Sequence, residues 1–287
     1  MNQQQIATDV LLEKYAKHGE TTPHQVRARV ARGLAEAEQD YRTWQPRFVE
    51  ALEAGFIPGG RINSVVGSGV TATAINCLVQ PIGDAMSEVD EATGKVGITA
   101  ALGEAAETMR RGGGVGYDFS SLRPVGALVK GTHSLASGPL SYMRMFDSMC
   151  QTVESAGARR GAQMGVLRID HPDIEDFVNA KAKPYTEKEL SQFNISVGVT
   201  DAFMSALETD SQFELVHRAE PGEALKEQGA YRRDDGMWVY RKVRARELWG
   251  LITKSTYDFA DPGVLFLDRM NQENNLAYCE TIEATNP

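Results

Sequence analysis

Hydrophobic residues recur at the spacing of an amphipathic helix along roughly the first 55 residues of the chain. Thr22 to Gln25 has the sequence of a capping box with proline at the first helical position. After it, Val26 and Val30 continue one apolar face. Phe56 to Arg61, which contains one proline and two glycines, interrupts this pattern. The sequence therefore predicts an N-terminal helical domain over residues 1–58.

From residue 72 onward, short apolar segments with strand-like alternation are separated by segments of helical periodicity. Five strands are expected, over residues 72–79, 115–119, 166–169, 193–199 and 264–267. Alternation of this kind is typical of parallel βα units. The polar stretch 213–243, with Asp235 and Gly236 before an alternating segment, predicts an edge hairpin. The expected fold class is α/β, with a helical cap followed by about five parallel βα units over residues 59–287.

The most distinctive segment is glycine-rich and leads out of a predicted helix that ends near Met109. Arg110 and Arg111 fall where a helix C-terminus favours cations, and Gly112 to Gly114 follow as a stop signal. Successive glycines leave backbone amides open to a ligand, although a helix stop followed by a tight turn also accounts for them. A dinucleotide fingerprint is not matched, because Tyr117 stands at the third glycine position and the run leaves a helix instead of opening one.

Composition narrows the classes of function. With 42% apolar and 24% charged residues in 287, the chain is an ordinary globular protein, and no run of about 18 apolar residues predicts a membrane span. The N-terminus has no signal-peptide pattern, so a cytoplasmic location is expected. A net charge of −9 disfavours duplex nucleic acid as a partner. Neither the three cysteines nor the five histidines have metal-ligand spacing, so no metal site is expected.

Cys77 is the cysteine with the most informative surroundings. Strand alternation places it on the same side as Ile75 and Val79, which is consistent with a core cysteine and equally with a pocket thiol. Cys150 lies in a helical pattern, and both it and Cys279 are expected to be structural, as buried small hydrophobic residues.

Two loops carry separated cations. The loop over 121–133 contains Arg123 and Lys130, and the loop over 155–165 combines guanidinium and amide donors with small residues. These donors are Arg159, Arg160 and Gln163. They are suited to holding phosphate or reading the edge of a base, and solvated surface cations are an equal alternative.

Taken together, these features resemble the catalytic subunit of the ribonucleotide reductases over nearly the whole chain. The segments that carry the resemblance are Phe56–Arg61, Asn76–Cys77 with Asp84, Arg111–Phe119, Leu122–Pro124, Ala136–Pro139, Arg159–Gly165, His171–Ile174 and Ala284–Pro287. They are most similar to class II, the adenosylcobalamin-dependent branch. The resemblance implies that the βα units form the first half of a ribonucleotide-reductase-type αβ barrel.

The resemblance also implies the residues of a substrate site. Cys77 would be one of two thiols that reduce the ribonucleotide and end as a disulfide. Asn76, Gly113 and Gly114 would line the substrate pocket. Asn286 would hydrogen-bond the substrate beside the radical centre, as a second catalytic residue.

A second site is implied for an allosteric effector, a deoxynucleotide or ATP. Asp84 would bind the ribose of the effector, and Arg123 and Lys130 would bind its phosphates. The loop over 159–165 would lie between effector and substrate and pass on which base is to be reduced, through Arg159, Arg160 and Gln163.

In this family the Asn-Pro pair is followed by the radical cysteine and then by a glutamate, whereas this chain ends at Pro287. The chain is therefore expected to be an N-terminal portion, inactive alone. Completed in trans, it is expected to reduce ribonucleotides by a thiyl-radical mechanism, as a homodimer with adenosylcobalamin and a thioredoxin-like dithiol. An incomplete sequence, a split gene and an intein all remain open, and so does a diphosphate or a triphosphate substrate. The alternatives are a nucleotide-binding regulatory or assembly module without catalysis, and a class I large subunit.

Overall fold

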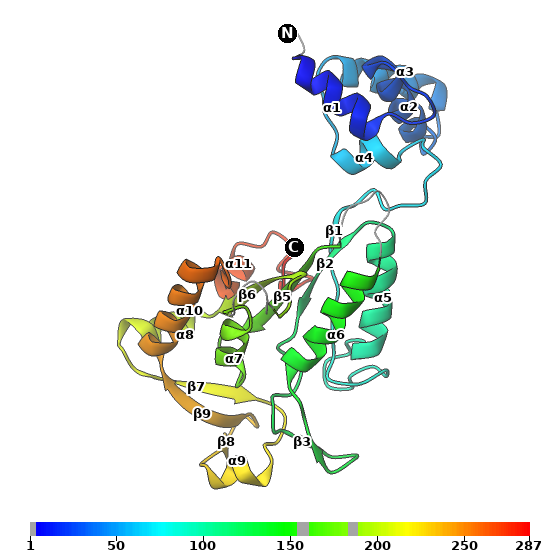
Figure 1. Cartoon of the computed structure of the whole chain (residues 1–287). Helices are drawn as coiled ribbons and strands as arrows, with labels where there is room; N and C mark the ends of the chain where they lie inside the picture. Colours follow the sequence, from blue (N-terminus) through cyan, green and yellow to red (C-terminus); the bar gives the residue numbers. More distant parts are fainter. Residues whose placement is uncertain (1–3, 154–160, 183–188) are drawn as a thin grey trace. The chain divides into compact units, whose positions relative to one another are not determined.

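The chain divides into two compact units, Met1–Asn76 and Cys77–Pro287 (Figure 1). The computed structural model describes residues 4–153, 161–182 and 189–287. The boundary lies later than the predicted position at residue 58, so residues 59–76 belong to the first unit.

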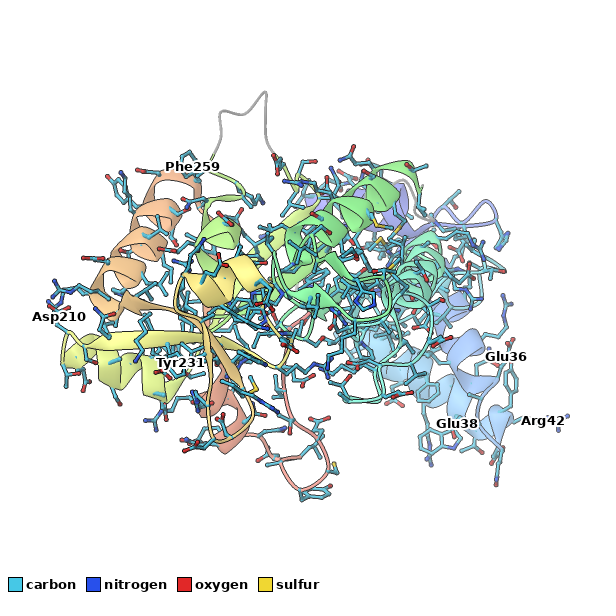
Figure 2. The ribbon with its side chains drawn as sticks, turned by 90° about the horizontal axis from the view of Figure 1, so that it is seen from below. Glu36, Glu38, Arg42, Asp210, Tyr231 and Phe259 are labelled. Atoms are coloured by element: carbon cyan, nitrogen blue, oxygen red, sulfur yellow. The ribbon has the colours of Figure 1, made fainter. Side chains whose placement is uncertain are left out.

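The first unit is helical, as predicted. Its helices are α1 (Gln5–Tyr15), α2 (Pro23–Ala35), α3 (Tyr41–Glu53) and α4 (Gly60–Val65). Thr22 forms the predicted capping box, because its side chain accepts from Gln25 N while the Gln25 side chain accepts from Thr22 N. Glu36, Glu38 and Arg42 lie on the exposed side of this unit, around the connection from α2 to α3 (Figure 2).

Arg29 explains why the segment after residue 58 packs with the first unit. Its guanidinium is 3% exposed and pairs with Glu20 at 2.8 Å. It also donates to the carbonyl oxygens of Tyr15 (2.9 Å) and Asn63 (3.0 Å). A buried charge of this kind is tolerated only when paired and hydrogen-bonded, and here the partners come from α1, from α4 and from the segment between α1 and α2.

The second unit contains the predicted parallel sheet of five strands, in the order β1-β2-β5-β6-β10. Its strands are β1 (Cys77–Val79), β2 (Gly114–Asp118), β5 (Gln163–Arg168), β6 (Phe193–Val199) and β10 (Gly263–Phe266). The five strands lie in the sheet in the same order as along the chain, and each adjacent pair is parallel. Successive βα units produce this arrangement. Strand β1 is shorter than predicted, and β5 begins earlier, at Gln163.

Helices cover one face of this sheet, with α5, α6 and α7 lying side by side over it (Figure 1). The helices of the second unit are α5 (Ile98–Arg110), α6 (Pro139–Thr152), α7 (Ile174–Asn179), α8 (Asp201–Glu208), α9 (Glu223–Glu227), α10 (Ala245–Phe259) and α11 (Leu267–Gln272). Tyr117, Phe119, Phe146 and Phe193 form an aromatic cluster in the core beneath them. Alternate residues of β2 therefore point to the helices, and the others point to the opposite face.

The polar excursion is antiparallel, as expected, but it does not form an edge of the main sheet. It builds a separate sheet in the order β7-β9-β8 from β7 (Gln212–His217), β8 (Tyr231–Arg232) and β9 (Trp238–Arg244). Tyr231, at the start of β8, donates to Glu214 on β7 at 2.7 Å (Figure 2). A smaller ribbon pairs β3 (Leu128–Val129) with β4 (Ser134–Leu135). Among the described residues, no helix combines the length and the apolar character needed to cross a bilayer.

Candidate active site and nucleotide pocket

The face of the sheet opposite the helices carries the exposed thiol of Cys77. In the parallel register, Cys77 pairs with Gly114 and Val79 pairs with Gly116. Paired residues of neighbouring strands point to the same face of a sheet, so the Cys77 side chain lies above a strip of β2 that has no side chains. Asp118 is the next residue of β2 on this face.

The last residues of the chain lie against this glycine strip. A Cβ added to Gly114 would lie 2.9 Å from Pro287 Cγ, and one added to Gly116 would lie only 1.8 Å from the carbonyl oxygen of Thr285. No side chain fits at Gly116 while Thr285 stays in place, which is a physical reason for glycine there. The structure thereby places the Asn286 backbone over the strip of β2 that pairs with Cys77 and Val79.

Two predicted substrate residues are not placed on this strip. A Cβ at Gly113 would point to Leu78 Cδ1 (3.0 Å) and Thr108 Cγ2 (2.8 Å), so Gly113 faces the helices and not the Cys77 side. Asn76 is exposed and is the last residue of the first unit. The role of Asn76 in substrate binding stays a prediction.

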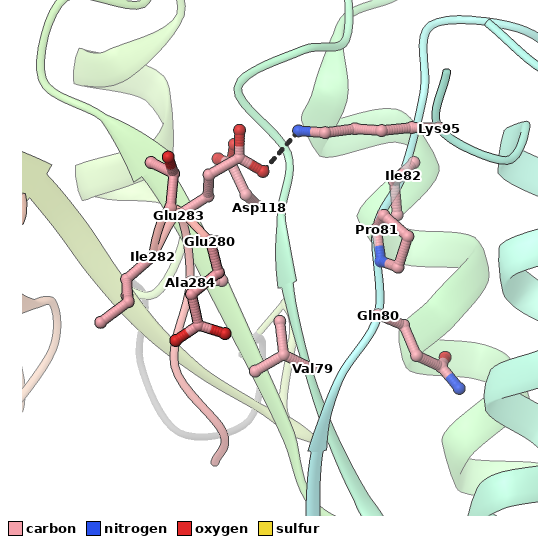
Figure 3. Close-up of a pocket in the computed structure, with 11 residues that line it drawn as sticks. Val79, Gln80, Pro81, Ile82, Lys95, Asp118, Glu280, Ile282, Glu283 and Ala284 are labelled. Atoms are coloured by element: carbon pink, nitrogen blue, oxygen red, sulfur yellow. Dashed lines mark hydrogen bonds and ion pairs between the residues drawn. The ribbon is translucent and has the colours of Figure 1, made fainter. Parts of the chain in front are cut away.

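The terminal segment is held by side chains of the second unit. Asn271 on α11 accepts from Ile282 N at 2.7 Å and donates to Ile282 O at 2.9 Å. Lys95 pairs with Glu283 at 2.6 Å across a cavity of about 320 Å³ (Figure 3). The position of the segment is therefore fixed by contacts at Ile282 and Glu283.

Asp118 also lines this cavity, and burial raises its pKa above the ordinary value of an aspartate (Figure 3). Its carboxylate accepts from the backbone N of Ser120 at 3.0 Å. Sequence reasoning missed Asp118, Lys95 and Glu283. Only Asp118 had a usable signal, since strand alternation places it on the same face as Gly114.

The three predicted effector residues line one pocket of about 690 Å³. Arg123 donates from Nε to Asp84 Oδ2 at 2.9 Å, and its backbone N donates to the same carboxylate at 3.2 Å. Arg123 Nη1 also donates to the carbonyl oxygen of Leu128 at 3.1 Å. Burial raises the pKa of Asp84 despite these bonds from Arg123. Lys130 borders the same pocket.

Two buried histidines hold the backbone immediately before Arg123. His171 Nε2 lies 3.0 Å from the carbonyl oxygen of Leu122, and His217 Nε2 lies 3.3 Å from that of Ser121. Each Nδ1 accepts from a backbone N–H, at 3.1 Å in His171 and 2.9 Å in His217, so each Nε2 carries the proton and donates. Burial lowers the pKa of His171 to about 4 and that of His217 to about 3. No sequence signal pointed to this pair, because His171 and His217 are far apart in the chain and follow no spacing typical of a shared site.

We expect the stability of the second unit to fall as pH falls from about 6.5 to 4, in part through His171. The unfolded chain takes up a proton in this window and folded His171 does not, which is worth on the order of 3 kcal/mol. Asp173 acts in the opposite direction, because burial raises its pKa to about 6. Urea unfolding at pH 7 and pH 4.5 should therefore show a smaller loss in His171→Gln than in the wild type. His133→Gln is the control, because His133 is exposed. Equal losses of stability in the wild type, His171→Gln and His133→Gln would contradict the contribution assigned to His171.

The predicted loop between effector and substrate is only partly described. Arg159 and Arg160 lie outside the described residues. Gln163 is not a loop residue, because it begins β5 and is fully buried. Its side chain accepts from Tyr117 Oη at 3.2 Å and donates to Phe146 O at 3.1 Å, so its amide is used within the core.

The other two cysteines differ in environment. Cys150 is buried on α6, and burial raises the pKa of its thiol to about 11. Cys279 is exposed and lies next to Glu280, which lines the cavity of about 320 Å³. Among the residues that the structure describes, no group of histidines, cysteines and carboxylates is arranged to hold a metal ion.

The fold and the site define one class of protein: a parallel αβ scaffold with an exposed thiol over a glycine strip and a separate charged pocket. Comparison with known proteins is consistent with that class. The family described as "Ribonucleotide reductase, barrel domain" matches residues 75–287. The chain belongs to this family.

Curated relatives extend the likeness. The chain is 39% identical to a vitamin B12-dependent ribonucleoside-diphosphate reductase of Mycobacterium tuberculosis, over 98% of this chain and 38% of the relative. It is 36% identical to the protein of the same name from Thermoplasma acidophilum, over 74% of this chain and 24% of the relative. A ribonucleoside-diphosphate reductase subunit alpha of Chlamydia trachomatis is 26% identical over 91% of this chain. The chain spans less than two fifths of the length of each of these relatives.

Proposed function

We propose that this chain is the N-terminal portion of a class II ribonucleotide reductase that makes deoxynucleotides for DNA synthesis. The observation that carries the proposal is the thiol of Cys77 beside Gly114, on the sheet face against which Thr285 to Pro287 lie. The names of the relatives favour ribonucleoside diphosphates as substrates and adenosylcobalamin as the cofactor.

The proposed chemistry needs a thiol close to the ribose. The 2′-hydroxyl leaves as water when a thiol supplies its proton, and two thiols together supply two electrons and become a disulfide. Cys77 is one of these thiols, and the second is expected from a part of the protein beyond this chain. An external thioredoxin-like dithiol then reduces the disulfide, so that the balance is one dithiol oxidised for each ribonucleotide reduced.

The glycine strip serves the substrate by its lack of side chains. Gly114 and Gly116 leave room for a chain segment close to the sheet, and the Asn286 amide lies on that segment. Asn286 Nδ2 donates to its neighbour Pro287 O at 3.2 Å, and in the proposed complex it turns to a ribose hydroxyl. This assignment of Asn286 rests on the family resemblance together with its position over β2.

Adenosylcobalamin, when bound, supplies the radical that starts the reaction. Neither of the two cavities described above is lined by a histidine or cysteine that could ligate cobalt. We therefore assign no residue of this chain to the cofactor and derive no step from it.

The proposal is tested by completing the chain. The 287 residues are mixed with a segment that carries the remaining part of a class II relative, and reduction of a ribonucleoside diphosphate is measured with adenosylcobalamin and a dithiol. Deoxynucleotide formation that needs both pieces supports the proposal. Effector binding without any recovery of activity favours the rival function, a regulatory or assembly module. The observation that supports this rival is that Asp84, Arg123 and Lys130 line one pocket. Rescue that needs a separate radical-generating subunit in place of adenosylcobalamin favours class I.

We also propose that the pocket of Asp84 binds a deoxynucleotide or ATP effector, in a cytoplasmic homodimer. Replacing Lys130 by alanine is expected to weaken binding of dATP roughly tenfold, because one charge-assisted bond to phosphate is lost. Lys254→Ala is the matched control, since Lys254 is exposed on α10 and does not line the pocket. Calorimetric titration measures both, and equal affinities would remove Lys130 from the site.

A further inference from the structure

The pocket of about 690 Å³ has a second wall to which the family resemblance assigned no role. Asp84, Arg123 and Lys130 belong to one wall, and Arg232 and Trp238 of the small antiparallel sheet belong to the other. Strand register pairs Arg232 on β8 directly with Trp238 on β9. Directly paired residues share one face of an antiparallel sheet, so the guanidinium and the indole project together from the same face.

Backbone hydrogen bonds join the two walls. Leu128 N donates to Glu220 O at 2.7 Å, and Gly222 N donates to Gly126 O at 2.9 Å. Both bonds connect the loop that carries Lys130 with the segment that leads from β7 into α9. The small sheet is therefore fixed against this loop, and the placement of Arg232 opposite the loop does not depend on side-chain packing alone.

The cations of the pocket differ in how far they are already engaged. Arg123 is bound to Asp84 and to Leu128 O, and Arg218 pairs with Asp90 at 2.5 Å. Within the described part of the chain, neither Lys130 nor Arg232 forms an ion pair, and Arg232 donates only from Nε, to the carbonyl oxygen of Gly236 at 3.3 Å. These two cations are therefore the ones left to neutralise an anionic ligand.

Glu220 lines the same pocket as Lys130 and Arg232. The pKa of Glu220 is lowered, first by its hydrogen bond from Lys226 and further by the charges of Lys130 and Arg232. Glu220 itself pairs with Lys226 at 2.8 Å. The positive charges of both cations therefore act on one carboxylate that borders the pocket.

We propose that Arg232 is a phosphate ligand of the effector site, and that it binds the triphosphate of a deoxynucleoside triphosphate together with Lys130. The inference rests on the proposed effector function of this pocket. A guanidinium matches phosphate oxygens with two parallel donors, which a lysine does not. Glu88 and Glu91 also border the pocket, so the ligand is expected to enter with Mg²⁺, which offsets the repulsion between carboxylates and phosphates.

The test compares two adjacent arginines. Arg232→Ala is expected to weaken binding of Mg²⁺-dATP to the 287-residue chain by roughly 10- to 100-fold, because a charge-assisted contact is lost. Arg233→Ala removes the same charge one residue later, where the side chain pairs with Glu214 and Asp235 instead of lining the pocket. It is expected to bind dATP as the wild type does. Deoxyadenosine, which has no phosphate, should bind all three proteins equally.

Three outcomes separate this inference from the proposed function. The role of Arg232 is supported if Arg232→Ala loses affinity for dATP and Arg233→Ala does not, while both variants bind deoxyadenosine as the wild type does. A loss in Lys130→Ala without a loss in Arg232→Ala overturns the role of Arg232 and leaves the effector site standing. Wild-type chain that binds no dATP, or that binds it independently of both cations, overturns the proposed site itself. An equal loss of dATP and deoxyadenosine binding shows damage to the small sheet and also rejects Arg232 as a phosphate ligand.

Discussion

The Cys77→Ser variant of the completed protein is expected to lose sustained ribonucleotide reduction by roughly 10²- to 10⁴-fold, the range that a positioned proton donor contributes. A serine hydroxyl keeps the size and place of the thiol, but it cannot form a disulfide and is a much weaker acid. The exposed position of Cys77 on β1 makes the substitution mild for folding. Multiple turnover with a dithiol reductant is the measurement, with substrate affinity followed separately.

The matched control is Cys279→Ser, because Cys279 is likewise an exposed free cysteine but is not on β1. It is expected to turn over at the wild-type rate. Retained substrate affinity in Cys77→Ser would place the loss in the chemical step and not in binding. Repeated turnover by the Cys77→Ser variant would show that another thiol reduces the substrate, and the proposed role of Cys77 would be wrong.

Gly116→Ala is expected to displace the terminal segment from the sheet. The new Cβ would lie 1.8 Å from the Thr285 carbonyl oxygen, far inside van der Waals contact. Overpacking of this kind costs about 1–3 kcal/mol, and the segment relieves it by moving away. Since a shift of about 1 Å can lower catalysis by roughly 10²-fold, turnover of the completed protein should fall by that order.

Cleavage after Glu283 by a glutamate-specific protease reports the displacement directly, and it should be faster in Gly116→Ala. Gly103→Ala is the control, because Gly103 lies within α5 and a Cβ there would meet no atom within 4 Å. That change is expected to stabilise the helix by up to about 1 kcal/mol. Unchanged cleavage and turnover in Gly116→Ala would mean that Thr285 does not lie over β2 in the working protein.

Cys77→Ser and Gly116→Ala test two different features of the same sheet face. In the proposed mechanism Cys77 on β1 supplies the reducing thiol, and Gly116 on β2 leaves the space in which the segment around Asn286 approaches the sheet. Loss of activity in both, with binding of dATP unchanged, would separate the substrate face from the effector pocket. Loss of dATP binding in either variant would indicate that the two sites are coupled through the sheet.

The order of the elements in the second unit could be read from the sequence. The strands β2, β6 and β10 were placed to within one residue, because alternating apolar residues between turn signals are a local property of the chain. The grouping of Asp84, Arg123 and Lys130 was also foreseen through the family resemblance, and the structure places all three in one pocket.

Other features depended on contacts between distant residues. The boundary after Asn76 follows from Arg29, whose partners include the Asn63 carbonyl, and no local pattern of apolar residues shows that a distant arginine is buried. The prediction of Gln163 as a loop donor is wrong, because β5 begins at this residue. Its sequence neighbourhood could not show this, since an amide is equally suited to a loop and to a hydrogen bond with the buried Tyr117.

By itself, the sequence determined the class of fold, the family and the position of Cys77 on its strand, since these follow from periodicity and from short motifs. Only the tertiary structure decided which glycine faces the thiol and that Arg232 and Lys130 lie at one pocket. It also decided which pocket cations form no ion pair with the residues that the structure describes. Strand register and charge pairing join residues far apart in the chain, and one residue of register reverses the face to which every side chain points.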